Sequence, residues 1–166
     1  MRHTTVNKIS ISIDFVRGAI AKVPLTAEKI DTLLYSCRIP RTLLEVPHAR
    51  VSLLQYSQLT TALMRESDDE LLGHGYHPLP MGSLSILVHW LVASKTMGQV
   101  VHRLERFYQV MGRGMDISLG MDEDYFSMKI GNGFHPPESN VYINEFSFFC
   151  VHRILCWLRK DIFPIQ

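Results

Sequence analysis

Apolar residues recur along most of the chain at the spacing of three and four that is typical of amphipathic helices. Several of these stretches follow a residue that can cap a helix, such as Thr26, Ser52 with Gln55 three positions later, or Thr96. The pattern therefore predicts helices over 12–23, 26–37, 52–63, 84–93, 96–111 and 138–160, with a short helical turn at 41–44.

Two of the predicted helices have an unusual pattern of apolar residues. Ile9, Ile11 and Ile13 alternate as in a short strand, but apolar residues at helical spacing behind a possible Ser12 cap favour a helix over 12–23. The stretch 84–93 is apolar on nearly every face, which is typical of a helix packed on all sides. Its Trp90 is therefore expected to serve packing.

The period changes to two in a single region. Ile117, Leu119 and Met121 alternate before an acidic turn, and Phe126, Met128 and Ile130 alternate after it. This pattern predicts an antiparallel hairpin with one buried face. Because two strands bury little surface by themselves, we expect helices to cover them. The predicted fold class is α+β, predominantly helical, with a small antiparallel sheet near 115–130 packed against long helices.

Length and composition narrow the class of protein. The 166 residues suit one domain, and 46% hydrophobic with 20% charged residues is close to a globular average. A net charge of +1 argues against a domain that itself binds DNA through a basic face. The apolar run of 84–93 is too short to span a membrane, no secretory signal is present, and three cysteines without CxxC spacing suit a reducing compartment. We expect a cytoplasmic protein with no membrane contact.

No catalytic or cofactor-binding motif occurs, so the sequence predicts neither an enzyme nor a bound cofactor. His74 and His77 beside the acidic residues 68–70 suggest a metal cluster at first sight. The two histidines lie in a predicted loop rather than one helical turn apart. A solvated loop is therefore favoured, and no metal site is predicted.

Four residues are the candidates for binding a small ligand. Ser85 and His89 share one face of the 84–93 helix, although a histidine satisfied by the Ser85 hydroxyl or by a backbone carbonyl is favoured over a pocket. Arg103 and Arg106, with His102, form a positive strip that could receive a carboxylate or phosphate. A solvated helix face is the favoured alternative for that strip.

Four segments together resemble one known family. They are FVRGAI, LLEVPHARVSLLQYSQL, GSLSILVHWLVASKTMGQVVHRLERFYQVM and MDISLGMDEDYFSMKI. In this order they are similar to the N-terminal, arabinose-binding-like regulatory domain of bacterial AraC/XylS-type transcription regulators, a subgroup that includes regulators of amino-acid catabolism. The resemblance runs from about Phe15 to Lys160. His89-Trp90 depart from it, because members usually have small or apolar residues there.

The resemblance implies a function. Residues 1–166 would form a single effector-sensing and dimerisation domain, truncated at its C-terminus, with the DNA-binding helix-turn-helix domain absent from the chain. Its expected partners are a small-molecule effector (an amino acid, organic acid or fatty acid) and a second copy in a homodimer, with DNA reached only through the C-terminal domain. The alternative is a dimerisation module without a small-molecule ligand, which would use the apolar face of the 97–111 or 140–158 helix.

Overall fold

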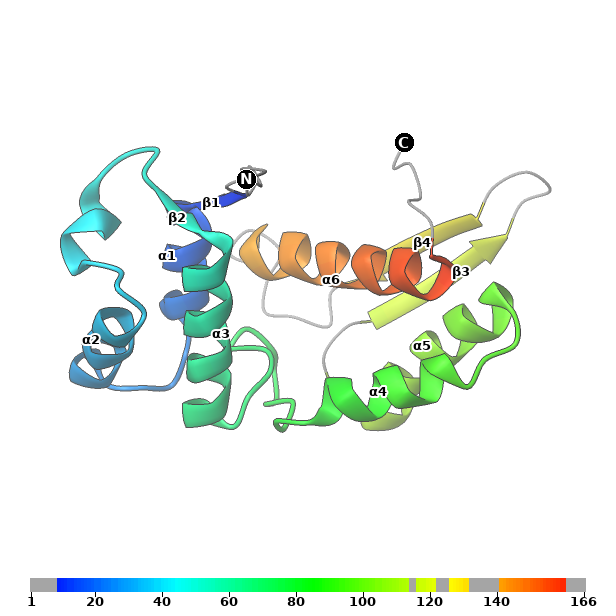
Figure 1. The fold of residues 1–166 in the computed structure, drawn as a ribbon. Helices are drawn as coiled ribbons and strands as arrows, with labels where there is room; N and C mark the ends of the chain where they lie inside the picture. Colours follow the sequence, from blue (N-terminus) through cyan, green and yellow to red (C-terminus); the bar gives the residue numbers. More distant parts are fainter. Residues whose placement is uncertain (1–8, 114–115, 122–125, 132–140, 161–166) are drawn as a thin grey trace, which may run out of the picture. The chain divides into compact units, whose positions relative to one another are not determined.

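A computed structural model describes residues 9–113, 116–121, 126–131 and 141–160, and it has the predicted fold class, mostly helical α+β (Figure 1). The chain divides into two compact units, residues 1–67 and 68–166. Each unit has its own small antiparallel strand pair and its own helices.

In the first unit, two short strands lead directly into helices. β1 (Ser10–Ser12) runs into α1 (Ile13–Ala21), and β2 (Arg50–Ser52) runs into α3 (Leu53–Ser67). The strands pair antiparallel, with Ile11 opposite Val51. The strand and the helix that the pattern around 9–13 suggests therefore both occur, one directly after the other. The Ser12 hydroxyl caps α1 by accepting a hydrogen bond from the Asp14 amide at 3.2 Å. β2 was not predicted, because three residues are too few to show alternation.

The predicted capping box of α3 is confirmed. The Ser52 hydroxyl accepts a hydrogen bond from the Gln55 amide at 3.1 Å, and the Gln55 side chain accepts one from the Ser52 amide at 3.0 Å. α3 contacts α1 and α2. The ring of Tyr56 lies edge-on to Phe15, with centroids 6.2 Å apart. The buried apolar residues of this unit are Ile13, Val16, Ala19, Val23, Leu33, Leu34, Cys37, Ile39, Val51, Tyr56, Leu59 and Leu63.

The predicted helix after Thr26 is confirmed as α2 (Ala27–Ser36). It ends in a Schellman motif, in which the Arg38 amide donates to the Tyr35 carbonyl and the Ile39 amide donates to the Leu34 carbonyl, both at 2.9 Å. This motif places Arg38 in the left-handed region at φ +58°. A short 3₁₀ helix, η1 (Arg41–Glu45), follows as predicted.

The second unit begins with a loop and an antiparallel helix pair, α4 (Ser83–Val92) and α5 (Met97–Met111). Thr96 caps α5 as predicted, and α5 buries the following residues along one face: Val100, Val101, Leu104, Phe107 and Tyr108. The expectation that α4 is packed on all sides is wrong. Leu87 and Leu91 are buried, but Ile86 is 68% exposed and Val92 54%. α4 is therefore packed along one face, and its outer apolar residues remain at the surface.

The predicted hairpin is confirmed. β3 (Asp116–Met121) pairs antiparallel with β4 (Phe126–Gly131), with Ile117 opposite Ile130, and β3 contacts α5. Ser118, Ser127 and Lys129 are exposed, as expected of the polar face. The side chains predicted to form its buried face lie outside the described side chains.

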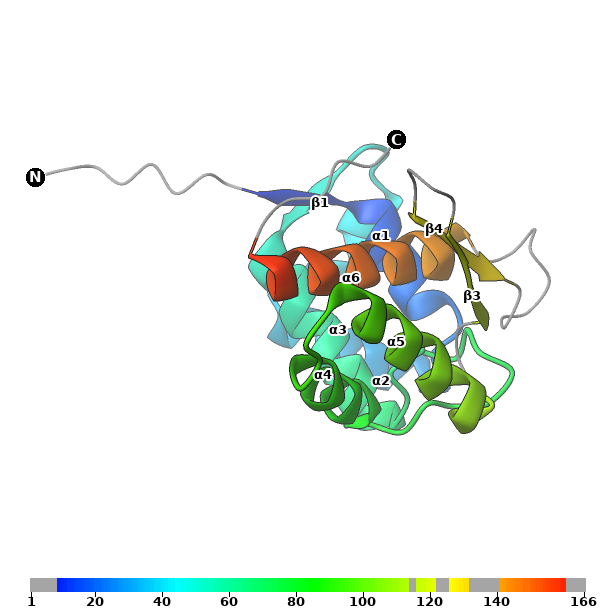
Figure 2. The same cartoon turned by 90° about the vertical axis from the view of Figure 1, so that its right-hand side faces the viewer.

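The last helix, α6 (Val141–Arg159), covers the α4–α5 pair, and both views show it lying alongside α5 (Figures 1 and 2). The predicted start at 138–140 lies outside the described residues. The hydrophobic core of the second unit is shared by the three helices and the preceding loop: Leu71, Leu79, Leu87, Leu91, Val100, Leu104, Phe107, Tyr108, Ile143 and Val151. None of the helices in the described residues has the length and apolar composition needed to cross a membrane.

Candidate functional site

His89 and Ser85 lie one turn apart on the exposed side of α4. The His89 Nδ1 atom is 2.7 Å from the backbone carbonyl oxygen of Ser85. Because a carbonyl only accepts hydrogen bonds, Nδ1 carries the proton and donates, which leaves Nε2 toward solvent. The structure thus contains a local hydrogen bond to a backbone carbonyl, one of the two local partners that the sequence suggests for His89.

Arg103 connects α5 to the end of α4. Its Nη1 atom donates to the Trp90 carbonyl at 2.6 Å and to the Ser94 hydroxyl at 3.0 Å, and its guanidinium lies 5.7 Å from the centroid of the Trp90 ring. The positive charge thus meets the negative end of α4, where the last carbonyls lack helical partners. Trp90 is 40% exposed, and the guanidinium of Arg103 lies over its ring.

Arg106 is exposed on α5, one turn beyond Arg103. Within the described residues, no side-chain to side-chain hydrogen bond joins Ser85, His89, Arg103 and Arg106. The structure therefore places the four on neighbouring helices but assigns two of them local bonds to the backbone. Their role in ligand binding stays a prediction.

The loop that precedes α4 is organised by two buried carboxylates. Asp69 accepts hydrogen bonds from the amides of Leu71, Gly73 and Leu79 at 2.7–2.9 Å. Glu70 accepts from the amides of Gly82 and Leu84, both at 2.8 Å, at the N-terminus of α4. These carboxylates satisfy backbone donors that helix and loop geometry leaves unpaired.

The histidines of this loop lie in different surroundings. His74 is buried, with its ring 5.1 Å from that of Tyr142, whereas His77 is exposed. No three metal-ligating side chains of the described residues come together as a metal site. The loop is not simply solvated, as the sequence suggested, because Asp69, Glu70 and His74 are all buried.

Two side chains in the second unit have raised pKa values. Burial raises the pKa of the Cys150 thiol to about 11. Burial, together with the nearby Cys150 and Glu70 groups, also raises the pKa of Tyr108 well above its ordinary value. In both cases an apolar environment disfavours the charged form. The two groups are therefore neutral at ordinary pH and act as packing residues.

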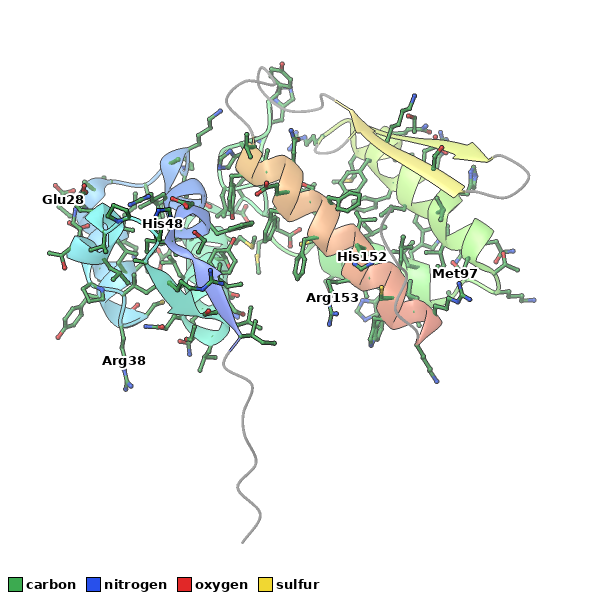
Figure 3. The ribbon with its side chains drawn as sticks, turned by 90° about the horizontal axis from the view of Figure 1, so that it is seen from above. Glu28, Arg38, His48, Met97, His152 and Arg153 are labelled. Carbon is green, nitrogen blue, oxygen red and sulfur yellow. The ribbon has the colours of Figure 1, made fainter. Side chains whose placement is uncertain are left out.

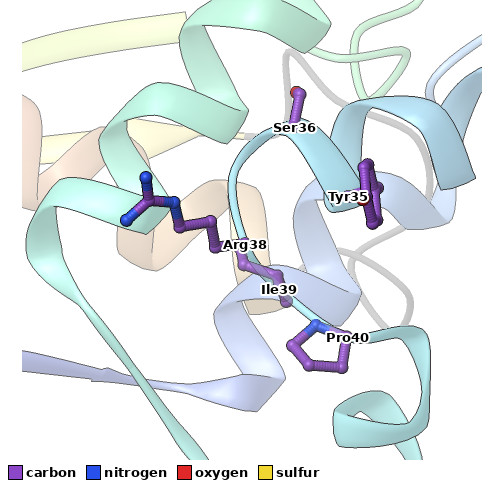
Figure 4. A pocket seen from close by; sticks show the side chains of 5 residues that line it. All are labelled: Tyr35, Ser36, Arg38, Ile39 and Pro40. Atoms are coloured by element: carbon purple, nitrogen blue, oxygen red, sulfur yellow. The ribbon is translucent and has the colours of Figure 1, made fainter.

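An open pocket of about 570 Å³ lies in the first unit at the turn between α2 and η1 (Figure 4). Its lining is mainly apolar, with two hydroxyls and one guanidinium: Tyr35, Ser36, Arg38, Ile39 and Pro40. Tyr35 is 85% exposed, and it projects from the turn on the side opposite to Arg38 (Figure 4). The volume lies within the range of small-molecule sites.

Sequence reasoning missed this pocket. Its residues follow the end of a short helix and carry no motif, so only the left-handed conformation of Arg38 distinguishes the turn. That conformation belongs to the Schellman motif at the end of α2, and the residue after it, Ile39, is 1% exposed.

Comparison with protein families gives a match over most of the chain. A family model described as the arabinose-binding domain of AraC transcription regulator, N-terminal, matches residues 29–166. Comparison with curated proteins and with solved structures gives no significant match. The matched range includes both the pocket and the α4–α5 pair.

Proposed function

The chain belongs to the family of N-terminal arabinose-binding domains of AraC transcription regulators, and from this premise we propose that it senses a small-molecule effector. The family match over 29–166 is the observation that carries the proposal. The family is a non-enzymatic ligand-binding domain. The proposed role is to bind a metabolite and to control an attached DNA-binding domain in the bacterial cytoplasm.

The pocket at the α2–η1 turn supports a binding role. Sites that bind small molecules are concave and have volumes of a few hundred cubic ångströms, as this pocket has. Tyr35 and Pro40 offer apolar surface, Ser36 a hydroxyl, and Arg38 a cation without an ion pair among the described residues. An effector with a carboxylate and an apolar part matches this lining, because a guanidinium binds carboxylates through paired hydrogen bonds.

Arg38 occupies a position where glycine is ordinarily preferred. A side chain at φ +58° costs roughly 1 kcal/mol relative to the right-handed region, and glycine avoids this cost. An arginine at the end of a Schellman motif is thus unfavourable for the local backbone. Because His48, Asp68, Leu72 and Lys160 also have positive φ, it is the place of Arg38 beside the pocket that supports a role for its guanidinium in binding.

Control of an attached domain has a thermodynamic requirement. The effector must bind one state of the regulator more tightly than the other, since equal affinity shifts no equilibrium. We propose that the DNA-binding domain lies C-terminal to this chain in the regulator, as the family implies. The effector would then change the affinity of that domain for promoter DNA.

A thermal-shift screen tests the sensing role. The chain is heated with separate panels of amino acids, organic acids and fatty acids. A ligand at a hundred times its dissociation constant adds about 2.7 kcal/mol and raises the melting temperature by several degrees. A reproducible shift by one class supports the proposal and identifies the effector. The absence of a shift in every panel would contradict it.

Two candidate sites are then separated by calorimetric titration of that effector. Arg38→Gly is the sharpest variant, because it relieves the left-handed arginine and keeps the fold while it removes the guanidinium. If the pocket binds the effector, Arg38→Gly and Tyr35→Ala weaken binding about tenfold or more, whereas His89→Ala and Arg106→Ala do not. The reverse result assigns binding to the α4–α5 face. Unchanged affinity in all four variants would reject both sites.

Self-association is a second candidate function, favoured by a specific observation on α6. Phe149 is 58% exposed and Trp157 is 61% exposed, although both are large aromatic side chains on a helix that packs in the core. Exposed apolar patches of this kind mark interaction sites. The homodimer expected from the family therefore has a candidate surface.

A further inference from the structure

The side chain of Gln55 connects the pocket turn to the start of α3. Its Nε2 atom donates to the Arg38 carbonyl oxygen at 2.7 Å, and its Oε1 atom accepts from the Ser52 amide at 3.0 Å. Gln55 is half-buried and stands outside the set of residues that line the pocket. One side-chain amide therefore completes the capping box of α3 and also holds the backbone of the pocket turn.

The bond from Gln55 acts on the peptide group that fixes this turn. The peptide between Arg38 and Ile39 donates through its N–H to the Leu34 carbonyl at 2.9 Å, and it accepts from Gln55 through its carbonyl. Arg38 itself is in the left-handed region at φ +58°, which side chains rarely adopt. Bonds at both ends of the peptide keep Arg38 in that conformation. Its side chain extends outward from the first unit (Figure 3).

The choice of glutamine at this position separates two roles. A capping box accepts glutamine or glutamate, because both offer an acceptor oxygen to the amide of the capping residue. Only glutamine also offers an N–H donor, since an ionised carboxylate has none. The cap of α3 therefore does not require an amide at position 55, whereas the bond to the Arg38 carbonyl does.

We propose that Gln55 is a positioning residue of the pocket, which acts through the Arg38 backbone to aim the guanidinium at the carboxylate of a ligand. The inference rests on the proposed sensing function, because it specifies how that pocket is built. A turn that is already ordered loses less conformational freedom when a ligand binds. Loss of the Gln55 donor should therefore lower the affinity for a carboxylate ligand and leave the fold intact.

Limited digestion with trypsin tests the hold on the turn without any ligand. Trypsin cleaves after arginine, and the carbonyl of the bond that it would cut after Arg38 is the one that Gln55 holds. Gln55→Glu removes the donor, so cleavage after Arg38 should become about fivefold faster, as expected for the loss of one hydrogen bond. Cleavage after Arg65, which is exposed in the same unit, should keep its rate. Mass spectrometry of the fragments measures both rates.

Two variants separate positioning from capping. Gln55→Glu keeps the acceptor for Ser52 and adds a negative charge at the helix N-terminus, so its melting temperature should stay within about 2 °C of that of the unchanged chain. Ser52→Ala removes the hydroxyl cap but keeps the bond between Gln55 and Arg38, so it should melt several degrees lower. Gln55→Met removes both polar atoms without a new charge, which controls for an attraction between Glu and Arg38.

Calorimetric titration with phenylacetate, a carboxylate with an apolar ring, measures the effect on binding. Both Gln55 variants should bind this probe about fivefold more weakly than the unchanged chain, whereas Ser52→Ala should bind it equally well. Affinity and melting temperature would then change in different variants. A purely structural role of Gln55 would instead lower both together.

Each outcome decides a separate point. Cleavage after Arg38 that neither Gln55 variant accelerates would overturn the inference, whether or not the probe binds. Faster cleavage with unchanged affinity for phenylacetate would also overturn it, because the turn would then be held without aiming the guanidinium. A chain that binds neither phenylacetate nor any compound of the thermal screen would contradict the sensing function, while the cleavage rates would still decide whether Gln55 holds the turn.

Discussion

Glu70 shows how a single buried side chain organises the second unit. It is 6% exposed, and each of its carboxylate oxygens accepts one backbone hydrogen bond, from Gly82 and from Leu84. A negative charge at this point also meets the positive end of α4. The sequence predicts a solvated loop around the acidic residues 68–70, because nothing local reveals that two of these carboxylates are buried.

Replacing Glu70 should therefore destabilise the protein. Glu70→Gln keeps one acceptor, but its amide nitrogen would face a backbone N–H group, so we expect a loss of about 1–3 kcal/mol in the free energy of unfolding. Urea denaturation measures this loss. Glu66→Gln is the matched control, since Glu66 is an exposed partner of Lys29 and its loss should cost under about 1 kcal/mol. Equal effects of the two variants would contradict the role given to Glu70.

The partly buried thiol of Cys150 gives a prediction about pH. Its pKa is about 9.0 in the unfolded chain and about 11 in the folded one, so the folded state holds the proton more tightly. The corresponding stability is complete below pH 9 and decreases as pH rises through 9 to 11, by about 2–3 kcal/mol. Chemical denaturation under reducing conditions at several pH values measures the loss.

Cys150→Ala should reduce this alkaline loss, and Tyr108→Phe should reduce the part above pH 10, because the pKa of Tyr108 is raised as well. If the Cys150→Ala variant kept the same dependence on pH between 9 and 11, the thiol would not be its source.

At the scale of elements, periodicity and caps carried most of the information. Ser52 with Gln55 marked the start of α3, Thr96 marked the start of α5, and alternation marked the hairpin. These signals are local, because a cap and its helix lie within a few residues of each other. By contrast, β2 depends on a long-range contact, because its three residues become a strand only through pairing with β1.

The prediction that α4 is packed on all sides fails for the same reason, because burial also depends on long-range contacts. The apolar pattern predicts a fully buried helix, yet Ile86 and Val92 are exposed because the fold supplies a partner for one face only. The candidate site was equally hard to predict. Arg103 looked available on its helix, but the tertiary fold brings it to the Trp90 carbonyl. The pocket beside Arg38 lies at a helix end that no sequence motif predicts.

The cap of α3 provides a test at this scale. Ser52→Ala removes the acceptor for the Gln55 amide, so we expect the free energy of unfolding to fall by about 1 kcal/mol. Ser57→Ala is the control: Ser57 is exposed inside the same helix, where alanine is the better helix former. Thermal melts that show the same change for both substitutions would argue against the cap.

At the scale of the whole molecule, the residue range of the family match coincides with neither of the two units. The match begins at residue 29 inside the first unit and runs through the second, so the family domain is confined to neither unit. The candidate pocket lies in the first unit, and the exposed aromatic residues of α6, Phe149 and Trp157, lie in the second. Sensing and self-association thus have separate candidate surfaces.

The central claim is that this chain is the effector-sensing part of a regulator. It is tested most directly by the affinity of a regulator carrying this chain for its promoter DNA, measured by fluorescence anisotropy with and without the effector that the thermal screen identifies. We predict a change of roughly 5- to 150-fold, the range of typical allosteric coupling, and its loss in the variant that no longer binds the effector. An effector that binds the chain but leaves DNA affinity unchanged would contradict the claim.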